Sequence, residues 1–122
     1  FVADDREVIR DGWTYTADTL ATFSADEDLV LILGADAAAG LPTWHQPQAV
    51  LARAHLAVMD RPGVERDEVE AAAGAVHWLD TPLLGISGTL LRARRRVGGS
   101  LRFLVPDAVL AYIESAGLYA RD

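Results

Sequence analysis

The chain contains no cysteine among its 122 residues. It therefore has no disulfide framework and no thiolate to act as a nucleophile or a metal ligand. No apolar run reaches the roughly 18–20 residues of a membrane-spanning helix, and no segment has the pattern of a signal peptide. These absences predict a soluble, cytoplasmic protein with no membrane partner.

Basic charge is also scarce. Lys and Arg together number 11 against 18 Asp and Glu, which gives a net charge of −7 and a pI near 4.8. Because non-specific nucleic-acid binding depends on neutralising phosphates, we expect no nucleic-acid partner, although a local basic site for one phosphate-bearing ligand remains compatible with this balance. The chain also lacks a Ser–His–Asp arrangement, a Walker-type glycine loop and histidines at metal-ligand spacing, so we predict no metal held by its side chains.

What is present is an alternation of apolar strands and helices in a chain of one-domain length, residues 1–122, with 51% hydrophobic residues. Strands are predicted at residues 1–9, 29–33, 56–59 and 76–79. Helices or helical turns are predicted at residues 17–23 (capped by Thr14 or Thr16), 36–39, 48–53, 65–73, 89–97 (capped by Ser87) and 107–116 (closed by Gly117). This alternation predicts an α/β fold with a parallel sheet flanked by helices.

The first candidate site follows the apolar strand at residues 29–33. Gly34 ends that strand, Asp36 comes directly after it, and Trp44 follows in a loop between two prolines. Open α/β sheets bind ligands at the carboxyl ends of their strands, where an acid and a large aromatic ring can hold a small aromatic or nucleotide-like ligand. The alternative is that Trp44 belongs to the core and Asp36 caps a helix.

The second candidate site is the predicted helix start at Ser87. A helix N-terminus attracts phosphate through its free N–H groups and its dipole, and Arg92 could fold back onto the same phosphate. The alternative is that Ser87 is an ordinary N-cap and the arginines at 92–96 form a solvated face. Two further features also have two explanations each. The segment 11–16 could contact an anionic ligand or could cap the helix that follows it. Arg61 could bind a phosphate or could form an ion pair with a nearby acid.

Six short motifs stand in a characteristic order along nearly the whole chain. They are Thr14-Tyr15-Thr16-Ala17-Asp18-Thr19-Leu20; Gly34-Ala35-Asp36; Pro42-Thr43-Trp44-His45; Arg61-Pro62-Gly63; Ile86-Ser87-Gly88-Thr89 with Arg92; and Leu104-Val105-Pro106-Asp107-Ala108-Val109 with Gly117-Leu118-Tyr119. In this order they resemble the bacterial nicotinate-nucleotide adenylyltransferases. Any one motif is weak, whereas six in sequence are specific.

The resemblance implies a Rossmann-like nucleotidyltransferase fold. It implies transfer of an adenylyl group from ATP to nicotinate mononucleotide, giving deamido-NAD and pyrophosphate, with Mg²⁺ accompanying the ATP. By similarity, Trp44 would stack on the pyridine ring, and Tyr15 would help to line the pocket around that ring. Thr16 and a backbone amide near His45 would bind the ring's carboxylate.

The resemblance also assigns the remaining site residues. Asp36 would help to shape the nucleotide site, and Arg61 would lie near the nucleotides. The ATP-binding residues would be Gly34, Ser87, Thr89 and Arg92.

The chain departs from the family pattern in what residues 1–122 do not contain. The family's first strand, its glycine-rich turn and its His-x-Gly-His motif are absent, so we expect this chain to be the C-terminal part of a nucleotidyltransferase domain and to be inactive alone. The missing segment would belong to the same polypeptide, to a homo-oligomer or to a second chain. Two alternatives stay open: a non-catalytic nucleotide-binding module, and an adenylyltransferase that prefers nicotinamide mononucleotide.

Overall fold

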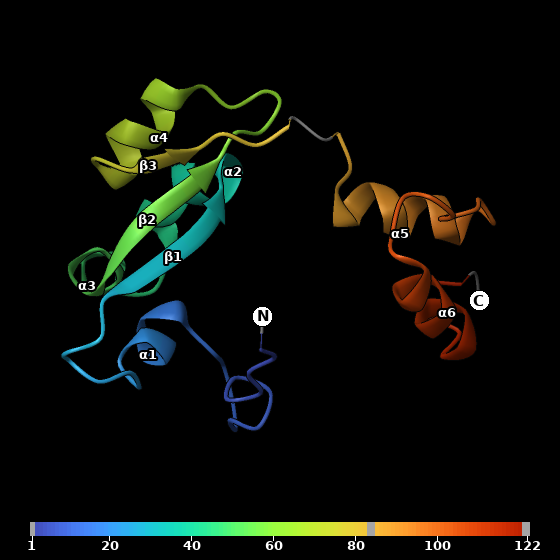
Figure 1. Ribbon diagram of the computed structural model, residues 1–122, viewed down its shortest axis with the longest axis horizontal. Coiled ribbons are helices and arrows are strands. Elements are labelled where there is room, and N and C mark those ends of the chain that lie inside the picture. The colour runs from blue at the N-terminus through green and yellow to red at the C-terminus, as the bar shows by residue number, and fades with distance from the viewer. Residues whose placement is uncertain (1, 83–84, 121–122) are drawn as a thin grey trace. The chain divides into compact units, whose positions relative to one another are not determined.

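The computed structural model describes residues 2–82 and 85–120. Contacts divide the chain into two compact units, residues 1–83 and residues 84–122. The first unit contains α1 (Thr16–Leu20), β1 (Leu29–Gly34), α2 (Ala35–Ala39), the 3₁₀ helix η1 (Leu41–Thr43), α3 (Pro47–Arg53), β2 (Ala54–Met59), α4 (Arg66–Ala73) and β3 (His77–Leu79) (Figure 1). The second contains α5 (Gly88–Arg96) and α6 (Asp107–Ser115). That residues 1–122 form a single partial domain stays a prediction.

The three strands form one parallel sheet in the order β1-β2-β3. Leu29 pairs with Ala54 at one end of β1, and Gly34 pairs with Met59 at the other. Helices α2 and α3 connect β1 to β2, and α4 connects β2 to β3. The predicted α/β, Rossmann-like architecture is therefore confirmed.

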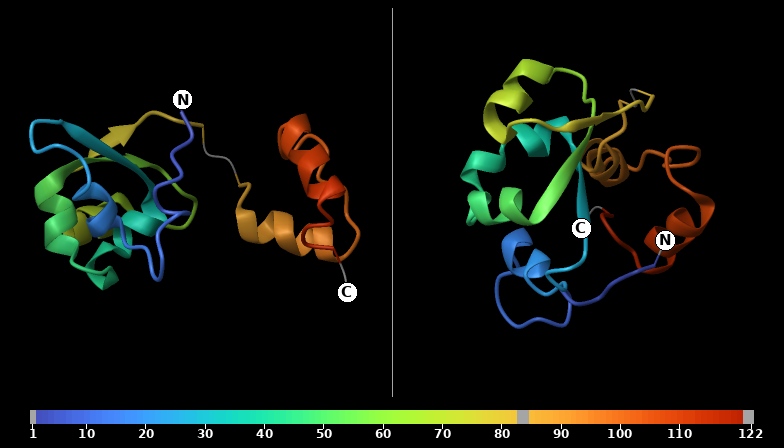
Figure 2. Two further views of the ribbon diagram at one scale, coloured as in Figure 1. Left: turned by 90° about the horizontal axis from the view of Figure 1, so that it is seen from below. Right: turned by 60° about the vertical axis from the view of Figure 1, so that its left-hand side comes forward.

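The core of the first unit lies on one face of this sheet. Leu29, Leu31 and Leu33 of β1 pack on it, and Leu56 and Val58 of β2 are buried in it. Helices α1 to α4 all contribute to the same cluster, through Ala17, Leu20, Ala35, Ala38, Val50, Val69 and Ala73. In the left view of Figure 2 these helices lie on one side of the strands.

The strand predicted at residues 1–9 was wrong, because residues 2–9 contain no strand. Val8 and Ile9 instead donate their backbone N–H groups to the carbonyl oxygen of Asp5 in a turn. Asp4 accepts hydrogen bonds from the backbone and side chain of Arg6, which lowers the pKa of this carboxyl from its ordinary value. Such local side-chain bonding competes with extended structure.

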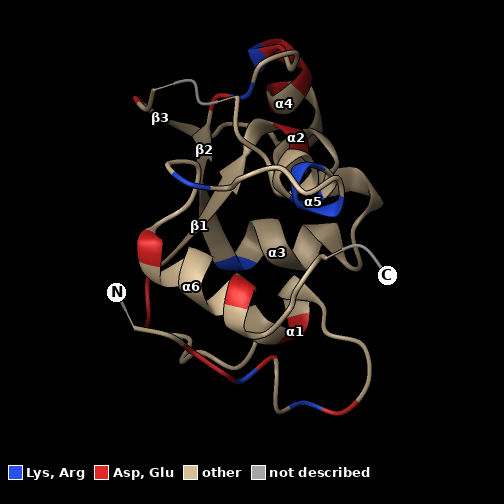
Figure 3. Cartoon of the chain, turned by 90° about the vertical axis from the view of Figure 1, so that its right-hand side faces the viewer, with Lys and Arg blue, Asp and Glu red and all other residues tan. Residues whose placement is uncertain are grey.

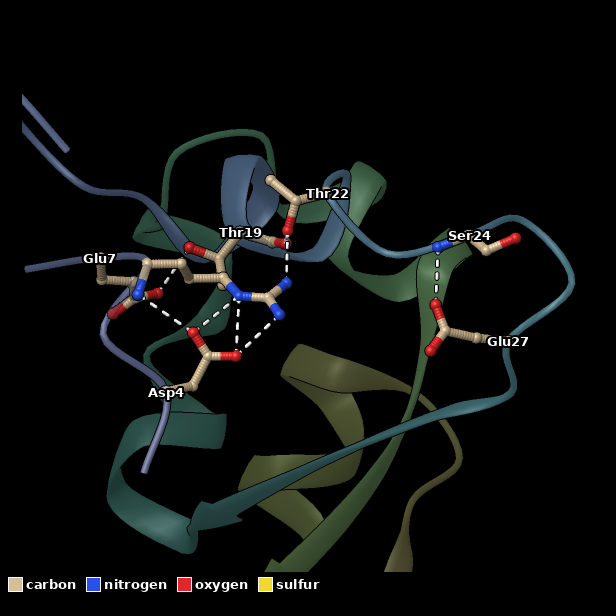
Figure 4. A network of polar contacts seen from close by, with 7 residues as sticks. Asp4, Glu7, Thr19, Thr22, Ser24 and Glu27 are labelled. Atoms are coloured by element: carbon tan, nitrogen blue, oxygen red, sulfur yellow. Dashed lines mark hydrogen bonds and ion pairs between the residues drawn. The ribbon is translucent and has the colours of Figure 1, made fainter. Parts of the chain in front are cut away.

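The same N-terminal segment is bonded to α1 (Figure 4). Arg6 donates to Thr22 Oγ1 at 2.6 Å, and its guanidinium lies 4.0 Å from the centroid of the Phe23 ring. Glu7 accepts a bond from the Thr19 hydroxyl. Charged residues that sequence patterning assigned to a strand therefore hold residues 4–7 against the helix.

Helix α1 begins differently from the prediction. Its N-cap is Tyr15, and neither Thr14 nor Thr16 supplies a side-chain cap. Thr14 Oγ1 instead donates to the carbonyl oxygen of Glu7. The helix stops at Leu20, three residues short of the predicted end. Its hydroxyl groups are thus available for purposes other than capping.

In the second unit, α5 begins at the cap and α6 ends before the glycine that the sequence predicts. Ser87 Oγ accepts a hydrogen bond from the backbone N–H of Leu90, which confirms it as the N-cap of α5. Past α6, Gly117 takes a φ of 61°. There the N–H of Leu118 bonds to Ile113 O and that of Gly117 to Glu114 O, the Schellman pattern of a glycine-terminated helix.

No helix in the described residues is both long enough and apolar enough to cross a bilayer. Charge is unevenly distributed along the chain. Residues 92–102 carry five arginines and no acidic residue, and Figure 3 shows this basic cluster on α5.

Candidate functional site

A pocket of about 270 Å³ lies where the start of α1 meets η1 and the loop before α3. Its lining consists of Thr14, Tyr15, Thr16, Thr43, Trp44 and His45. Two segments about 30 positions apart thus meet, and both belong to the motifs that carry the family resemblance. The pocket combines three aromatic rings with three threonine hydroxyl groups, a composition suited to a flat ring bearing a polar substituent.

Trp44 has two roles that sequence reasoning treated as alternatives. Its side chain is half-buried and packs against the core cluster. It also lines the pocket. The residue is therefore anchored by the core while part of its ring remains accessible, which limits the entropy lost when a ligand stacks on it.

Tyr15 and His45 form the opposite part of the lining. Their rings are stacked, with centroids 4.2 Å apart and planes inclined by 28°. Gln46 lies 3.1 Å from His45, between the Nε2 atoms, and its backbone is left-handed with φ 50°. Pro47 then starts α3 at the position where a missing N–H costs nothing. The left-handed backbone of Gln46 thus sets the direction in which the chain passes from His45 into α3.

Two potential donors belong to residues of this lining. Among the described residues, neither Thr16 Oγ1 nor the backbone N–H of His45 has a hydrogen-bond partner. The Thr43 hydroxyl, in contrast, donates to Gly40 O at 2.8 Å. The two donors predicted for a ligand carboxylate, Thr16 and an amide near His45, are thus both without a protein partner among the described residues.

Asp36 does not line this pocket. It lies in the first turn of α2, beside the carboxyl end of β1, and Arg61 Nε approaches its Oδ1 to 3.4 Å. A Cβ added to Gly34 would lie 2.7 Å from that oxygen and 3.3 Å from Arg61 Nε. Glycine at position 34 therefore makes room for the ion pair. Arg61 thus pairs with a nearby acid, and its proximity to an anionic ligand stays a prediction.

Arg61 also lines a second pocket of about 460 Å³, formed by residues 60–67 between β2 and α4. Arg66 donates through Nε to Asp60 at 3.1 Å across this loop. This hydrogen bond lowers the pKa of Asp60 and raises that of Arg66 from their ordinary values. The ion pair ties the loop to the start of α4 and leaves Arg61 at the carboxyl end of the sheet.

The predicted phosphate site lies in the second unit, at the N-terminus of α5. Arg92 folds back toward this end: its Nη2 donates to Thr89 Oγ1 at 3.3 Å, and its Nη1 lies 2.9 Å from where a Cβ on Gly88 would be. Glycine at position 88 therefore gives the guanidinium space above the first turn. Ser87, Thr89 and Arg92 thus lie together at this helix start, and their role in binding phosphate stays a prediction.

The structure thus assembles the predicted residues as three groups. Tyr15, Thr16, Trp44 and His45 share a pocket; Gly34, Asp36 and Arg61 meet at the sheet edge; Ser87, Thr89 and Arg92 cluster on α5. Sequence reasoning did not assign Thr14 and Thr43 to the pocket. Both belong to motifs it singled out, so their position beside Tyr15 and Trp44 was the available signal.

Comparison with known proteins defines the relationship. The cytidylyltransferase-like family matches residues 1–94. The chain belongs to the cytidylyltransferase-like family. Its first unit and the start of α5, with all three groups of residues described above, fall within the matched range.

Individual members of the cytidylyltransferase-like family extend this finding. A probable nicotinate-nucleotide adenylyltransferase of Pseudomonas fluorescens is 41% identical over 140 residues, covering 97% of this chain and 65% of that protein. Proteins of the same name from Salinibacter ruber and Chromohalobacter salexigens are 42% and 40% identical, covering 93% and 96% of this chain and 60% and 64% of theirs. The predicted resemblance is confirmed, and the chain spans somewhat under two thirds of these relatives' length.

The described residues were also compared with what a magnesium ion requires. They contain no group of three or more His, Asp or Glu side chains able to hold a metal ion. The Asp36 carboxylate is already paired with Arg61.

Proposed function

We propose that the full-length polypeptide transfers an adenylyl group from ATP to nicotinate mononucleotide, giving deamido-NAD and pyrophosphate. The observation that carries the proposal is the pocket between α1 and η1, in which an accessible Trp44 ring adjoins two donors without protein partners. The names of the relatives agree with this substrate.

The pocket's chemistry favours nicotinate over nicotinamide. The carboxylate of nicotinate is an acceptor only, and it suits the Thr16 hydroxyl and the His45 backbone N–H, which can both donate. The amide of nicotinamide would turn an NH₂ donor toward at least one of these groups. Because a mismatched polar group is costly to bury, this arrangement discriminates between two rings of almost equal shape.

In the proposed reaction, a 5′-phosphate oxygen of the mononucleotide attacks the α-phosphorus of ATP. A P–O bond forms there, the bond from the α-phosphorus to the α,β-bridging oxygen breaks, and pyrophosphate leaves. Such transfers need positioning and charge stabilisation more than a protein nucleophile. Trp44, Tyr15 and Thr16 would orient the acceptor.

The ATP phosphates would be held by the third group of residues, at the N-terminus of α5. Ser87 and Thr89 offer the N-terminus of α5 and a hydroxyl, and Arg92 offers a guanidinium already folded over that turn. Mg²⁺ would accompany these phosphates.

The first test is pyrophosphate release by the full-length polypeptide with ATP and either mononucleotide. Trp44→Ala should raise KM for nicotinate mononucleotide about tenfold, because aromatic stacking contributes roughly 0.5–1.5 kcal/mol. KM for ATP should stay nearly unchanged. Trp13→Ala is the matched control, since the Trp13 side chain is 86% exposed outside the pocket lining.

Because Trp44 also packs on the core, Trp44→Leu is measured alongside to retain apolar volume without the stacking ring. Equal weakening of both substrates would contradict the assignment of Trp44 to the pyridine ring. Saturable mononucleotide binding without turnover would indicate a non-catalytic binding module. Faster turnover with nicotinamide mononucleotide would contradict the proposed role of the two donors.

A further inference from the structure

Positive charge is concentrated in the second unit. Residues 85–120 carry five arginines and only two acidic residues, whereas the whole chain has a net charge of −7. All five arginines lie within residues 92–102, and four of them belong to α5 (Figure 3). None of the five takes part in an ion pair with a described residue. Like charges gathered this closely repel one another, so the cluster favours a negatively charged partner.

Three of these arginines make contacts within the chain. Arg92 donates to a hydroxyl group at the start of α5. Arg94 donates from Nε to the carbonyl oxygen of Ser100 at 2.6 Å and so closes the turn after α5. The guanidinium of Arg102 lies over the ring of the next residue, 5.0 Å from the ring centroid. Two arginines remain, and they are neighbours in the last turn of α5.

These two residues, Arg95 and Arg96, line a pocket of about 330 Å³. Val97 and Gly98 line it from the end of α5, and Ala120 lines it from the segment after α6. Two segments about 20 positions apart therefore meet here, and both belong to the second unit. The pocket lies at the opposite end of α5 from the proposed ATP phosphate site. At 1.5 Å per residue, the two ends of this nine-residue helix are roughly 12 Å apart.

Arg95 has a donor without an acceptor. Its Nε is buried, and within the described residues it has no hydrogen-bond partner. Nearly all buried polar groups in proteins are hydrogen-bonded, because an unpaired donor loses its contacts with water and gains nothing in return. A guanidinium also keeps its proton and its charge in every protein environment. The missing partner is therefore expected to be an acceptor with negative charge.

The helix dipole accounts for only part of this arrangement. Basic side chains in the last turn of a helix interact favourably with its C-terminal carbonyl groups. Fully exposed arginines would satisfy that preference, and Arg94 already bonds to a carbonyl oxygen beyond the helix. The dipole explains neither the pocket nor the buried Nε of Arg95.

We propose that Arg95 and Arg96 form a binding site for a small phosphate-class anion with at least two negative charges, such as pyrophosphate. Adjacent guanidinium groups present planar forks of N–H donors, which match phosphate oxygens in a bidentate manner. Their two full charges outweigh the roughly half negative charge at a helix C-terminus. This site goes beyond the proposed reaction, because no residue assigned to that reaction lines it.

The test is a calorimetric titration of the full-length polypeptide with pyrophosphate in metal-free buffer. Arg92→Gln is present in every protein titrated, because it weakens the phosphate site proposed at the other end of α5. One class of saturable site is expected to remain in this background. Adding Arg95→Gln and Arg96→Gln should weaken its affinity at least about tenfold, because charge-assisted hydrogen bonds are lost. Absence of saturable binding before these substitutions are added would overturn the proposal.

Arg102→Gln is the matched control. It removes the same charge from the same unit but lies outside the pocket lining, so it should change the affinity far less. Equal weakening by Arg102→Gln would reduce the effect to general electrostatic attraction and would overturn the proposal. Arg96→Gln alone keeps the test valid if the combined variant unfolds, because Arg96 is exposed. Circular dichroism verifies that each variant remains folded.

Titration with ATP in place of pyrophosphate identifies the source of the anion. If the ligand is free pyrophosphate, it should bind more tightly than ATP, and Arg95→Gln should leave the KM for ATP unchanged in the polypeptide that keeps Arg92. If the ligand is a nucleotide, ATP should bind more tightly and this KM should rise. Both results support the anion site. Pyrophosphate binding without any adenylyl transfer would contradict the proposed reaction alone.

Discussion

At the scale of single residues, Val58 and Val30 lie in neighbouring strands but in opposite environments. Val58 of β2 is fully buried in the core, whereas Val30 of β1 lies on the face that points away from the core and is 60% exposed. Val58→Ala removes two methyl groups from a packed core, so it should lower the free energy of unfolding of the 122-residue chain by about 2 kcal/mol. Val30→Ala removes the same atoms from a site still in contact with water and should cost well under half as much.

Urea unfolding of the 122-residue chain and its two variants, followed by circular dichroism, measures this difference. Equal costs at the two positions would mean that Val30 is covered by residues of the chain itself. That result would contradict the 60% exposure of the Val30 side chain.

Single residues also show what sequence could and could not decide about the site. Ser87 was predictable as an N-cap because capping depends on three consecutive residues, and the bond to Leu90 bears this out. The sequence did not decide whether Trp44 belongs to the core or to a ligand site, because its environment depends on the start of α1, almost 30 positions away. Patterns within one segment cannot settle contacts between segments.

At the scale of elements, the loop between β2 and α4 is closed by the Asp60–Arg66 pair. Because the hydrogen bond lowers the pKa of Asp60 in the folded state, the unfolded state takes up a proton first as pH falls. The pair's contribution is therefore complete above the ordinary carboxyl pKa and is lost as pH drops through the lowered one. Asp60→Asn should reduce the urea midpoint of the 122-residue chain slightly near about pH 6, and the difference should vanish near about pH 2.

Asp26→Asn is the control for this prediction. It makes the same change of charge in an exposed turn, and within the described residues its carboxylate has no hydrogen-bond partner. A midpoint difference between wild type and Asp60→Asn that persisted at the lower pH would exclude the ion pair as its source.

Elements differ in how well the sequence predicts them. The runs at residues 29–33 and 56–59 were recognisable as strands because each is apolar on both faces and bounded by polar turns. Residues 1–9 resemble a strand only at their ends, and Asp4, Asp5 and Arg6 satisfy one another and the backbone locally. The helix at Thr16 was found, but its cap was not: the predicted candidates were Thr14 and Thr16, and the N-cap is Tyr15, which lies between them.

At the scale of the whole molecule, the two units differ in how much core they contain. The first unit buries a cluster drawn from four helices and the sheet. In the second, Leu101 and Ile113 are the buried apolar residues among those described. Its helices have nine residues each, shorter than the roughly 12–15 at which isolated helices become stable in water.

Residues 84–122 should consequently not hold their fold as a separate peptide. Chains below about 40 residues usually need disulfides, metals or assembly, and this segment has no cysteine. Far-UV circular dichroism of the peptide should show weak helicity that declines gradually on heating. Ile113→Ala should change that spectrum little, whereas in the 122-residue chain the same variant should reduce the helical signal. A cooperative thermal transition in the peptide would instead make α5 and α6 an independent folding unit, and its Arg92 cluster could then be titrated with pyrophosphate on its own.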